Sequence, residues 1–157
     1  KLQARFPAWS LRMVGGAHDF DAVKKLAGTL GLERVHFEGF QNPEPYYRDA
    51  SIFCMTSAYE GFPNVLVEAA SFGCVPVAFD SFAAARDIIS DGENGCLVPA
   101  FDLDAYAETL ARLMSDDALR ERLAKNARRD AARFSPARII ERWFDLFADV
   151  AKERGSR

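Results

Sequence analysis

The chain has 157 residues, of which 49% are hydrophobic and 27% charged, and its formal net charge is −3. This balance supplies enough apolar material for one sizeable core, so we expect a single domain over residues 1–157. A mildly acidic chain lacks the broad basic surface that binds nucleic acid or anionic lipid, so we expect no nucleic-acid partner and only local recognition of phosphate.

From residue 1 to residue 99 short apolar runs alternate with helical patterns. Asp19 and Gly31 are placed to cap the first complete helix, and Gly73 to end the third. Residues 1–7 have the character of a last helical turn, which indicates a domain truncated at its N-terminus. Nearly continuous apolar strands separated by helices are typical of a doubly wound parallel sheet, buried on both faces. We expect strands at residues 10–14, 34–37, 51–55, 75–79 and 96–98, and helices at residues 19–30, 46–49, 64–72 and 86–89.

The rest of the chain has helical periodicity. The final helix carries an apolar stripe at helical spacing, typical of a core or interface surface. The stripe consists of Ile139, Ile140, Trp143, Phe144, Phe147 and Val150. We expect helices at residues 103–114, 118–133 and 136–152, capped by Asp102, Asp117 and Ser135.

The three cysteines, Cys54, Cys74 and Cys96, are odd in number and each lies in a short apolar run. Neither a disulfide framework nor a metal-ligand spacing is indicated, and we interpret all three as buried, reduced thiols. No signal peptide opens the sequence, and no apolar run approaches the ~18 residues of a membrane span. A cytoplasmic location is therefore the default expectation.

Ligands of a doubly wound sheet bind at the carboxyl ends of its strands, where the loop after the third strand holds Glu60. Glu68 follows about one turn inside the next helix, so both carboxylates can face one cleft. The first N–H groups of that helix carry positive partial charge and suit a diphosphate. A carboxylate near them can accept two hydrogen bonds from a ribose diol. A glutamate there would also favour the helix dipole with no ligand present.

The segment EGFPNVLVEA at residues 60–69, followed by GCVPV at 73–77, closely resembles the E-x7-E signature of retaining glycosyltransferases of family 4. Further matches are VGG after the first strand, VHFEGF around the second, and DGENGCLVP at residues 91–99. These enzymes have the GT-B architecture of two Rossmann-like domains. The resemblance implies that this chain is the C-terminal, donor-binding half, with additional C-terminal helices.

The resemblance assigns Glu60 to the catalytic centre, in contact with the transferred sugar, and Glu68 to the ribose hydroxyls. Phe40 and Gln41 would approach the base, and the backbone around residues 62–66 would hold the diphosphate and the sugar. The remaining expected donor-binding residues are Gly15, Gly16, Gly61, Phe62, Pro63, Asn64, Val65 and Leu66.

The resemblance also implies a UDP-linked sugar donor and transfer of a hexosyl or N-acetylhexosaminyl group with retention, in synthesis of bacterial surface polysaccharide or glycoconjugate. No metal or other cofactor is expected, because a helix N-terminus with an Arg and a Lys can stabilise the leaving diphosphate. In the family that pair follows an earlier strand, upstream of Lys1. The segment Phe82 to Ala85 replaces the glycines of many relatives, so the identity of the sugar stays open.

An N-terminal acceptor domain of the full-length protein is the implied partner, and it is absent from residues 1–157. The isolated chain is therefore expected to be inactive. Because the last helix of GT-B enzymes commonly crosses to the partner domain, part of its apolar stripe should be exposed here. The full-length enzyme is also compatible with peripheral association at the inner face of the membrane.

Two alternatives compete with this interpretation. A non-catalytic, flavodoxin-like binding or signalling module, such as a receiver domain, would need clustered acidic residues after the first strand, where this chain has Gly15 and Gly16. A GT-B nucleotide-sugar epimerase would epimerise or hydrolyse its donor without an acceptor. A dehydrogenase is disfavoured, because Gly15 and Gly16 are not followed by the remaining spacing of a dinucleotide fingerprint.

Overall fold

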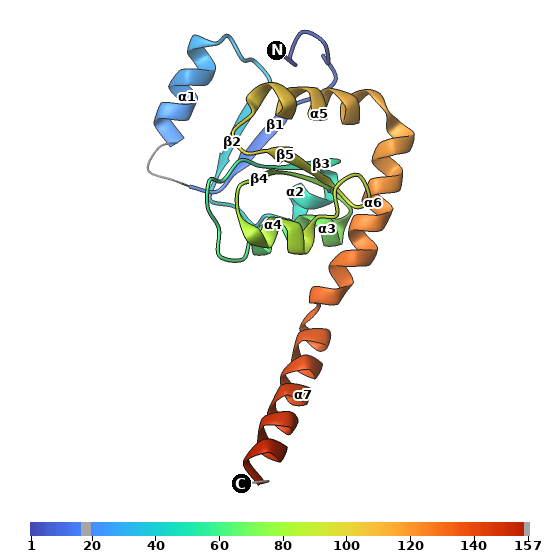
Figure 1. The fold of residues 1–157 in the computed structure, drawn as a ribbon. Helices are drawn as coiled ribbons and strands as arrows, with labels where there is room; N and C mark the ends of the chain where they lie inside the picture. The colour runs from blue at the N-terminus through green and yellow to red at the C-terminus, as the bar shows by residue number, and fades with distance from the viewer. Residues whose placement is uncertain (17–19, 156–157) are drawn as a thin grey trace.

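A computed structural model describes residues 1–16 and 20–155, so Asp19, the predicted first cap, lies outside the described residues. Strands and helices alternate as predicted (Figure 1). The strands are β1 (Leu11–Val14), β2 (Val35–Gly39), β3 (Ile52–Met55), β4 (Val75–Asp80) and β5 (Cys96–Pro99). The helices are α1 (Phe20–Thr29), α2 (Glu44–Asp49), α3 (Asn64–Phe72), α4 (Ala83–Ile88), α5 (Leu103–Ser115), α6 (Asp117–Ala131) and α7 (Pro136–Gly155), with the 3-10 turn η1 (Ala132–Phe134) between the last two.

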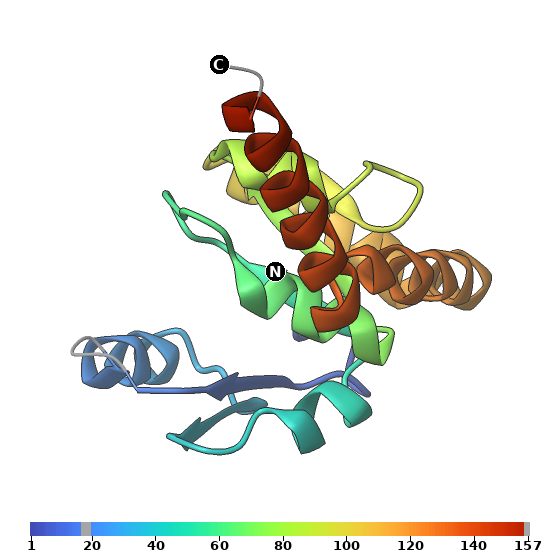
Figure 2. The same cartoon turned by 90° about the horizontal axis from the view of Figure 1, so that it is seen from below.

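All paired strands are parallel, which confirms the predicted α/β class. The ladder is nevertheless interrupted, because β1 pairs with β2 while β3, β4 and β5 form a second sheet in that order. Figure 2 shows the β1–β2 sheet lying apart from the other strands. Among the residues described, the predicted parallel strands therefore form two separate ladders. Apolar patterning identifies strands but carries no information about which edges meet.

The core surrounds β4, whose first five residues are buried. On one face Ala78 packs with Leu66 of α3. On the other face Val77 packs with Leu113 of α5 and Leu123 of α6. Figure 1 shows the same two layers, with α1 and α5 on one side of the strands and α3 and α4 on the other. Burial on both faces explains the uninterrupted apolar run of this strand.

Glycines end two helices where the backbone needs a positive φ. Gly73 follows α3 with φ 89°, and its N–H donates to the carbonyls of Ala69 and Ala70. Gly31 follows α1 with φ 62°. Both predicted stops are confirmed, because only glycine adopts this conformation without a steric penalty from a side chain.

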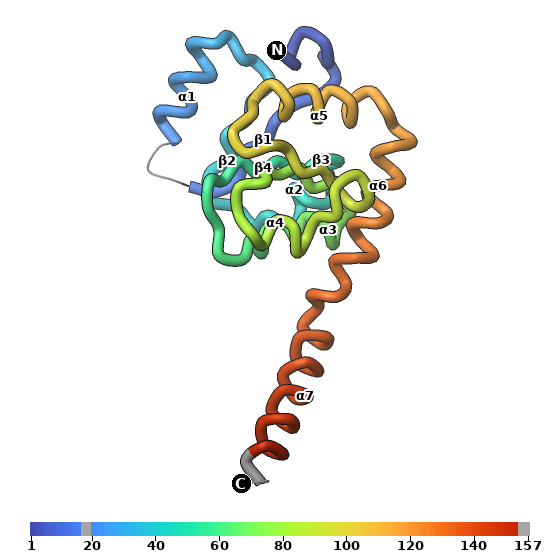
Figure 3. The backbone as a smooth tube through the Cα atoms, viewed as in Figure 1, coloured from blue at the N-terminus to red at the C-terminus, as the bar shows by residue number. Residues whose placement is uncertain are grey.

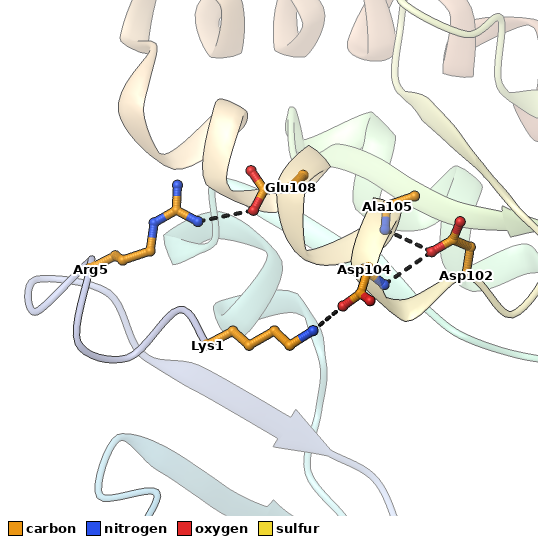
Figure 4. Close-up of polar contacts among 6 residues, drawn as sticks. All are labelled: Lys1, Arg5, Asp102, Asp104, Ala105 and Glu108. Carbon is orange, nitrogen blue, oxygen red and sulfur yellow. Dashed lines mark hydrogen bonds and ion pairs between the residues drawn. The ribbon is translucent and has the colours of Figure 1, made fainter.

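Two of the three later caps are confirmed. Asp102 accepts hydrogen bonds from the N–H groups of Asp104 and Ala105 (Figure 4), and Ser135 accepts one from Arg138 at 3.5 Å. The predicted cap Asp117 is wrong, because the preceding residue, Asp116, has the extended backbone and accepts from Leu119. Asp117 is already the first residue of α6.

The cysteine prediction holds for Cys74 and Cys96, which are buried and free. Cys54 is free but exposed, which corrects the expectation for this residue. The physical reason is its place on β3, which has a strand neighbour on one side alone among the residues described.

Helix α7 projects away from the rest of the molecule (Figure 3). Its side chains Trp143, Phe144 and Phe147 are 53%, 68% and 59% exposed. The predicted exposure of part of the stripe is thus confirmed. Within the part of the chain that the structure describes, no helix combines the length and the apolar character needed to span a bilayer.

Candidate functional site

The β3–α3 loop brings the predicted site residues to the carboxyl end of β3. Pro63 precedes α3 with φ −81° and ψ 83°, and no side chain caps the helix. The N–H of Asn64 donates to the Phe62 carbonyl at 3.0 Å, and the N–H of Leu66 to the Pro63 carbonyl at 2.9 Å. Fewer N–H groups are thus free for a diphosphate than the sequence predicts, because the tight turn at Pro63 satisfies two of them locally.

Some side chains of this loop are exposed and others are buried in the core. Phe62 and Val65 are 44% and 40% exposed, and the Phe62 ring contacts the ring of Phe134 with centroids 5.5 Å apart. Pro63 is buried and the Leu66 side chain has no exposed surface. Leu66 can therefore contribute only its backbone to a ligand.

Glu68 is the fifth residue of α3 and its side chain lies at the surface. The hydroxyl of Tyr47, on α2, donates a hydrogen bond to a Glu68 carboxylate oxygen at 3.3 Å. Burial, reinforced by the neighbouring Glu68 carboxylate, raises the pKa of Tyr47 to about 12. Sequence reasoning missed this contact, since Tyr47 lies 21 positions earlier and no local pattern links the two.

Glu60 lies in the loop before α3 and is partly buried. It makes no hydrogen bond or ion pair with residues 1–16 or 20–155, and none joins it to Glu68. Its carboxylate is thus available to a ligand.

The loops after β1 and β2 meet. The N–H of Gly15, whose φ is 122°, donates to the carbonyl of Gly39 at 2.7 Å. A Cβ on Gly16 would lie only 2.8 Å from the ring of Phe40, which is itself 87% exposed. The structure therefore brings together Gly15, Gly16 and Phe40, with Gln41 beside them at the surface.

The loops after β3 and β4 also meet, through a hydrogen bond from the Ser81 hydroxyl to the Ser57 carbonyl at 2.9 Å. At the end of β4 the Arg86 guanidinium donates to both oxygens of Asp80, at 2.7 and 2.5 Å. These hydrogen bonds lower the pKa of Asp80. The predicted site thus consists of two loop pairs, one on each sheet.

Among residues 1–16 and 20–155, no group of three or more His, Cys, Asp and Glu side chains is arranged to hold a metal ion.

The sequence profile of the family described as Glycosyl transferases group 1 matches residues 1–130. The chain belongs to this family. Its α/β fold matches the C-terminal domain of GT-B glycosyltransferases. Membership contradicts the alternative of a signalling module of the receiver type.

Similar proteins come from several bacteria. The chain is 34% identical over 151 residues to the exopolysaccharide phosphotransferase SCO2592 of Streptomyces coelicolor, covering 94% of this chain and 16% of that protein. It is 31% identical over 148 residues to the lipopolysaccharide core biosynthesis glycosyltransferase LpsE of Rhizobium meliloti, covering 92% and 43%. The crystal structure of Anabaena HepE in complex with UDP-glucose is similar with a TM-score of 0.81 and 28% identity, covering 93% and 43%. The chain thus spans less than half the length of each.

Proposed function

We propose that residues 1–157 are the donor-binding part of a retaining glycosyltransferase that transfers a hexosyl or N-acetylhexosaminyl group from a UDP-sugar. Bacterial surface polysaccharide or glycoconjugate is the proposed product. The observation that carries the proposal is the placement of Glu60 and Glu68 on either side of the start of α3, immediately after the carboxyl end of β3. The likeness to HepE, whose structure contains UDP-glucose, supports the choice of donor.

Glu68 is the proposed ribose ligand. A carboxylate offers about four lone-pair directions, and the Tyr47 hydroxyl occupies one of them. The remaining directions suffice for both hydroxyls of a ribose diol. Because the pKa of Tyr47 is about 12, its hydroxyl stays protonated at neutral pH and keeps donating to Glu68. The tyrosine would thus orient the carboxylate before the nucleotide binds.

The diphosphate would lie at the N-terminus of α3, where the helix dipole favours negative charge. Since Asn64 and Leu66 donate their N–H groups to nearby carbonyls, the helix N-terminus supplies only part of the positive charge that would stabilise the diphosphate. We therefore assign the rest of this positive charge to the Arg and Lys that the family resemblance places after an earlier strand. This arrangement would stabilise the leaving UDP without a metal ion.

Glu60 is the proposed contact to the transferred sugar. Its carboxylate is partly buried and has no partner among the described residues, so it can accept hydrogen bonds from sugar hydroxyls. Loss of this contact would affect recognition of the sugar more than recognition of UDP.

The acceptor would be bound by an N-terminal domain of the full-length enzyme, and the exposed stripe of α7 is the surface that we assign to that domain. The isolated chain would then bind the donor but transfer no sugar. Peripheral association with the inner face of the membrane belongs to the same proposal, because the relative LpsE is named for lipopolysaccharide core biosynthesis.

The test is a transfer assay with the full-length enzyme, a panel of UDP-hexoses and UDP-N-acetylhexosamines, and lipid-linked or polysaccharide acceptors. We expect one donor to give product whose anomeric configuration, read by NMR, equals that of the donor, and EDTA to leave the rate unchanged. Inversion would contradict the retaining mechanism. Epimerised donor formed without acceptor would support the epimerase instead, and transfer by residues 1–157 alone would contradict the assigned role of the missing domain.

A further inference from the structure

The loop after β4 borders the loop that carries Glu60. Strands β3 and β4 pair in parallel, so both loops begin at the same edge of the sheet. The Ser81 hydroxyl donates to the Ser57 carbonyl at 2.9 Å, which joins the two loops close to Glu60 in the chain. The end of β4, at Asp80, therefore lies beside the proposed position of the transferred sugar.

The segment from Asp80 to Arg86 presents few groups to a ligand. Phe82, Ala84 and Ala85 are only 7%, 7% and 0% exposed, because they pack into the core cluster that α4 shares with α3. Figure 1 shows these two helices on the same side of the strands. Asp80 and Arg86 are left as the charged side chains that residues 80–86 bring to the surface.

These two side chains form a planar, bidentate pair. The Arg86 guanidinium donates from Nε to Oδ1 of Asp80 at 2.7 Å and from Nη2 to Oδ2 at 2.5 Å. The hydrogen bonds lower the pKa of Asp80, so the carboxylate is ionised at neutral pH. The Asp80 side chain is 25% exposed and the Arg86 side chain 71%. The guanidinium is thus held in one orientation while most of it stays in contact with solvent.

The pair retains both donors and acceptors for a ligand. The carboxylate offers about four lone-pair directions, and Arg86 occupies one on each oxygen. Most N–H groups of the guanidinium are not used by Asp80. A sugar hydroxyl can donate and accept at once, so neighbouring hydroxyls of one ring can bridge the two side chains.

The charges of this pair select the class of sugar. Asp80 and Arg86 together carry no net charge, and the carboxylate of Glu60 lies in the adjoining loop. A sugar that itself carries a carboxylate would be repelled by both acidic side chains. Neutral hydroxyl groups meet no such repulsion. The arrangement therefore favours a neutral hexose over an acidic one.

We propose that Asp80 and Arg86 are specificity-determining residues for the donor, which bind hydroxyl groups of a neutral transferred hexose next to Glu60. The inference rests on the proposed function and deepens it. Asp80 accepts a hydrogen bond from one hydroxyl of the ring, and Arg86 donates to the same hydroxyl or to its neighbour. UDP itself does not contact the pair.

The test is calorimetric titration of the full-length protein with UDP and with the UDP-sugar that the transfer assay selects. We expect Asp80→Asn and Arg86→Gln each to reduce the preference for UDP-sugar over UDP about tenfold or more, the effect of losing a hydrogen bond to a charged group. Affinity for UDP should stay the same. Arg138→Gln is the matched control, because Arg138 is 69% exposed and pairs with Glu141 on α7, and it should bind both ligands as the parent does.

Monodeoxy forms of the selected donor identify the contact. Each of them lacks one hydroxyl of the transferred sugar. We expect one of these donors to bind the parent and Arg86→Gln equally well, because the hydroxyl that Arg86 contacts is then absent from both complexes. If Arg86→Gln weakened every monodeoxy donor as much as the intact one, the proposed contact would be wrong.

Arg86→Lys separates this role from a structural one. Arg86 lies in the last turn of α4, where a positive charge favours the helix dipole, and lysine keeps that charge. Lysine cannot form the planar fork, so this variant should fold as the parent does and still lose the preference for UDP-sugar. Full preference in Arg86→Lys would contradict the bidentate arrangement.

Two further results would overturn the proposal. Equal loss of affinity for UDP and UDP-sugar would assign the pair to the diphosphate, and unchanged preference in Asp80→Asn and Arg86→Gln would leave it as a surface ion pair, which contributes little to stability. In the second case the parent still binds UDP and transfers sugar, so only this inference fails. A parent protein that binds no UDP would remove the proposed function and this inference together.

Discussion

The hydroxyl of Tyr47 on α2 donates a hydrogen bond to the carboxylate of Glu68 on α3, with 3.3 Å between the two oxygens. The phenol is buried against the rings of Phe53 and Phe72, whereas the carboxylate lies at the surface. The buried Tyr47 side chain thus orients the exposed Glu68 carboxylate. The carboxylate is held at the candidate site and stays accessible to a ligand.

The folded chain should lose stability as the pH rises above 10, and Tyr47→Phe should remove the part of this loss that comes from ionisation of Tyr47. The folded chain raises the pKa of Tyr47 from 10.0 to about 12, so between these values the unfolded chain loses this proton first. The contribution of Tyr47 to stability is therefore complete below pH 10 and is lost as the pH rises toward 12. Thermal unfolding of parent and variant across this range measures the difference. If the difference in thermal stability between the parent and Tyr47→Phe stayed constant up to pH 12, the assigned pKa would be contradicted.

Glu68→Gln should weaken UDP binding about ten- to a hundredfold, because a hydrogen bond to a charged group is worth about 1.5–3 kcal/mol. The fold should be retained, since the amide oxygen of glutamine still accepts from Tyr47 and a helix charge contributes less than about 1 kcal/mol. Calorimetric titration with UDP measures the affinity. Glu121→Gln, an exposed glutamate on α6, is the matched control and should bind as the parent does. Equal affinity in Glu68→Gln, or unfolding of that variant, would remove the ribose role.

Glu60→Gln should leave UDP affinity nearly intact while it reduces the preference for UDP-sugar over UDP, because the proposed contact is with the hexose. The measurement is a pair of titrations, one with UDP and one with the UDP-sugar that the transfer assay selects. A variant that loses affinity for UDP itself would show that Glu60 contacts the nucleotide or supports the loop instead.

Much of this architecture is predictable from the sequence. Apolar runs and helix stops locate the strands and helices, because burial and backbone conformation are local properties at residues such as Gly73. Pairing is not local, and for this reason the break between β1 and β3 was not predicted. The exposure of Cys54 follows from the same break. Asp116 and Asp117 are neighbours, and the sequence alone does not show which of them caps α6. Their backbone angles in the structure distinguish them.

The candidate site was predictable in outline for a similar reason. A strand-end loop with Glu60, a tight turn and a helix with Glu68 is a local pattern, and the structure places it at the carboxyl end of β3. The side-chain partners were not predictable, because Tyr47 reaches Glu68 from another helix. The ion pair of Asp80 and Arg86 was missed because it joins the end of a strand to the following helix through side-chain rotamers that the sequence does not specify.

The exposed stripe of α7 should contribute little to the stability of this chain. Phe144→Ser and Phe147→Ser should each change the free energy of unfolding by no more than about 0.5 kcal/mol, since both rings are mostly exposed. Both should reduce self-association, because they remove apolar surface. Leu123→Ala, at a fully buried position, is the contrast and should cost about 2–5 kcal/mol. Urea unfolding measures the free energy of unfolding, and sedimentation measures self-association. A large destabilisation by Phe144→Ser or Phe147→Ser would show that α7 packs on its own domain.

The central claim is that UDP binds at the carboxyl ends of the strands, and an NMR titration of residues 1–157 with UDP tests it most directly, because chemical shifts report even millimolar affinities. We expect the largest chemical-shift changes at Phe62, Val65 and Glu68, with smaller changes at Gly16 and Phe40. At the opposite end of the strands a pocket of about 300 Å³ lies at the start of β5, lined by Asp91, Cys96, Leu97, Glu108, Thr109 and Arg112. Chemical-shift changes centred on that pocket would contradict the proposed binding site.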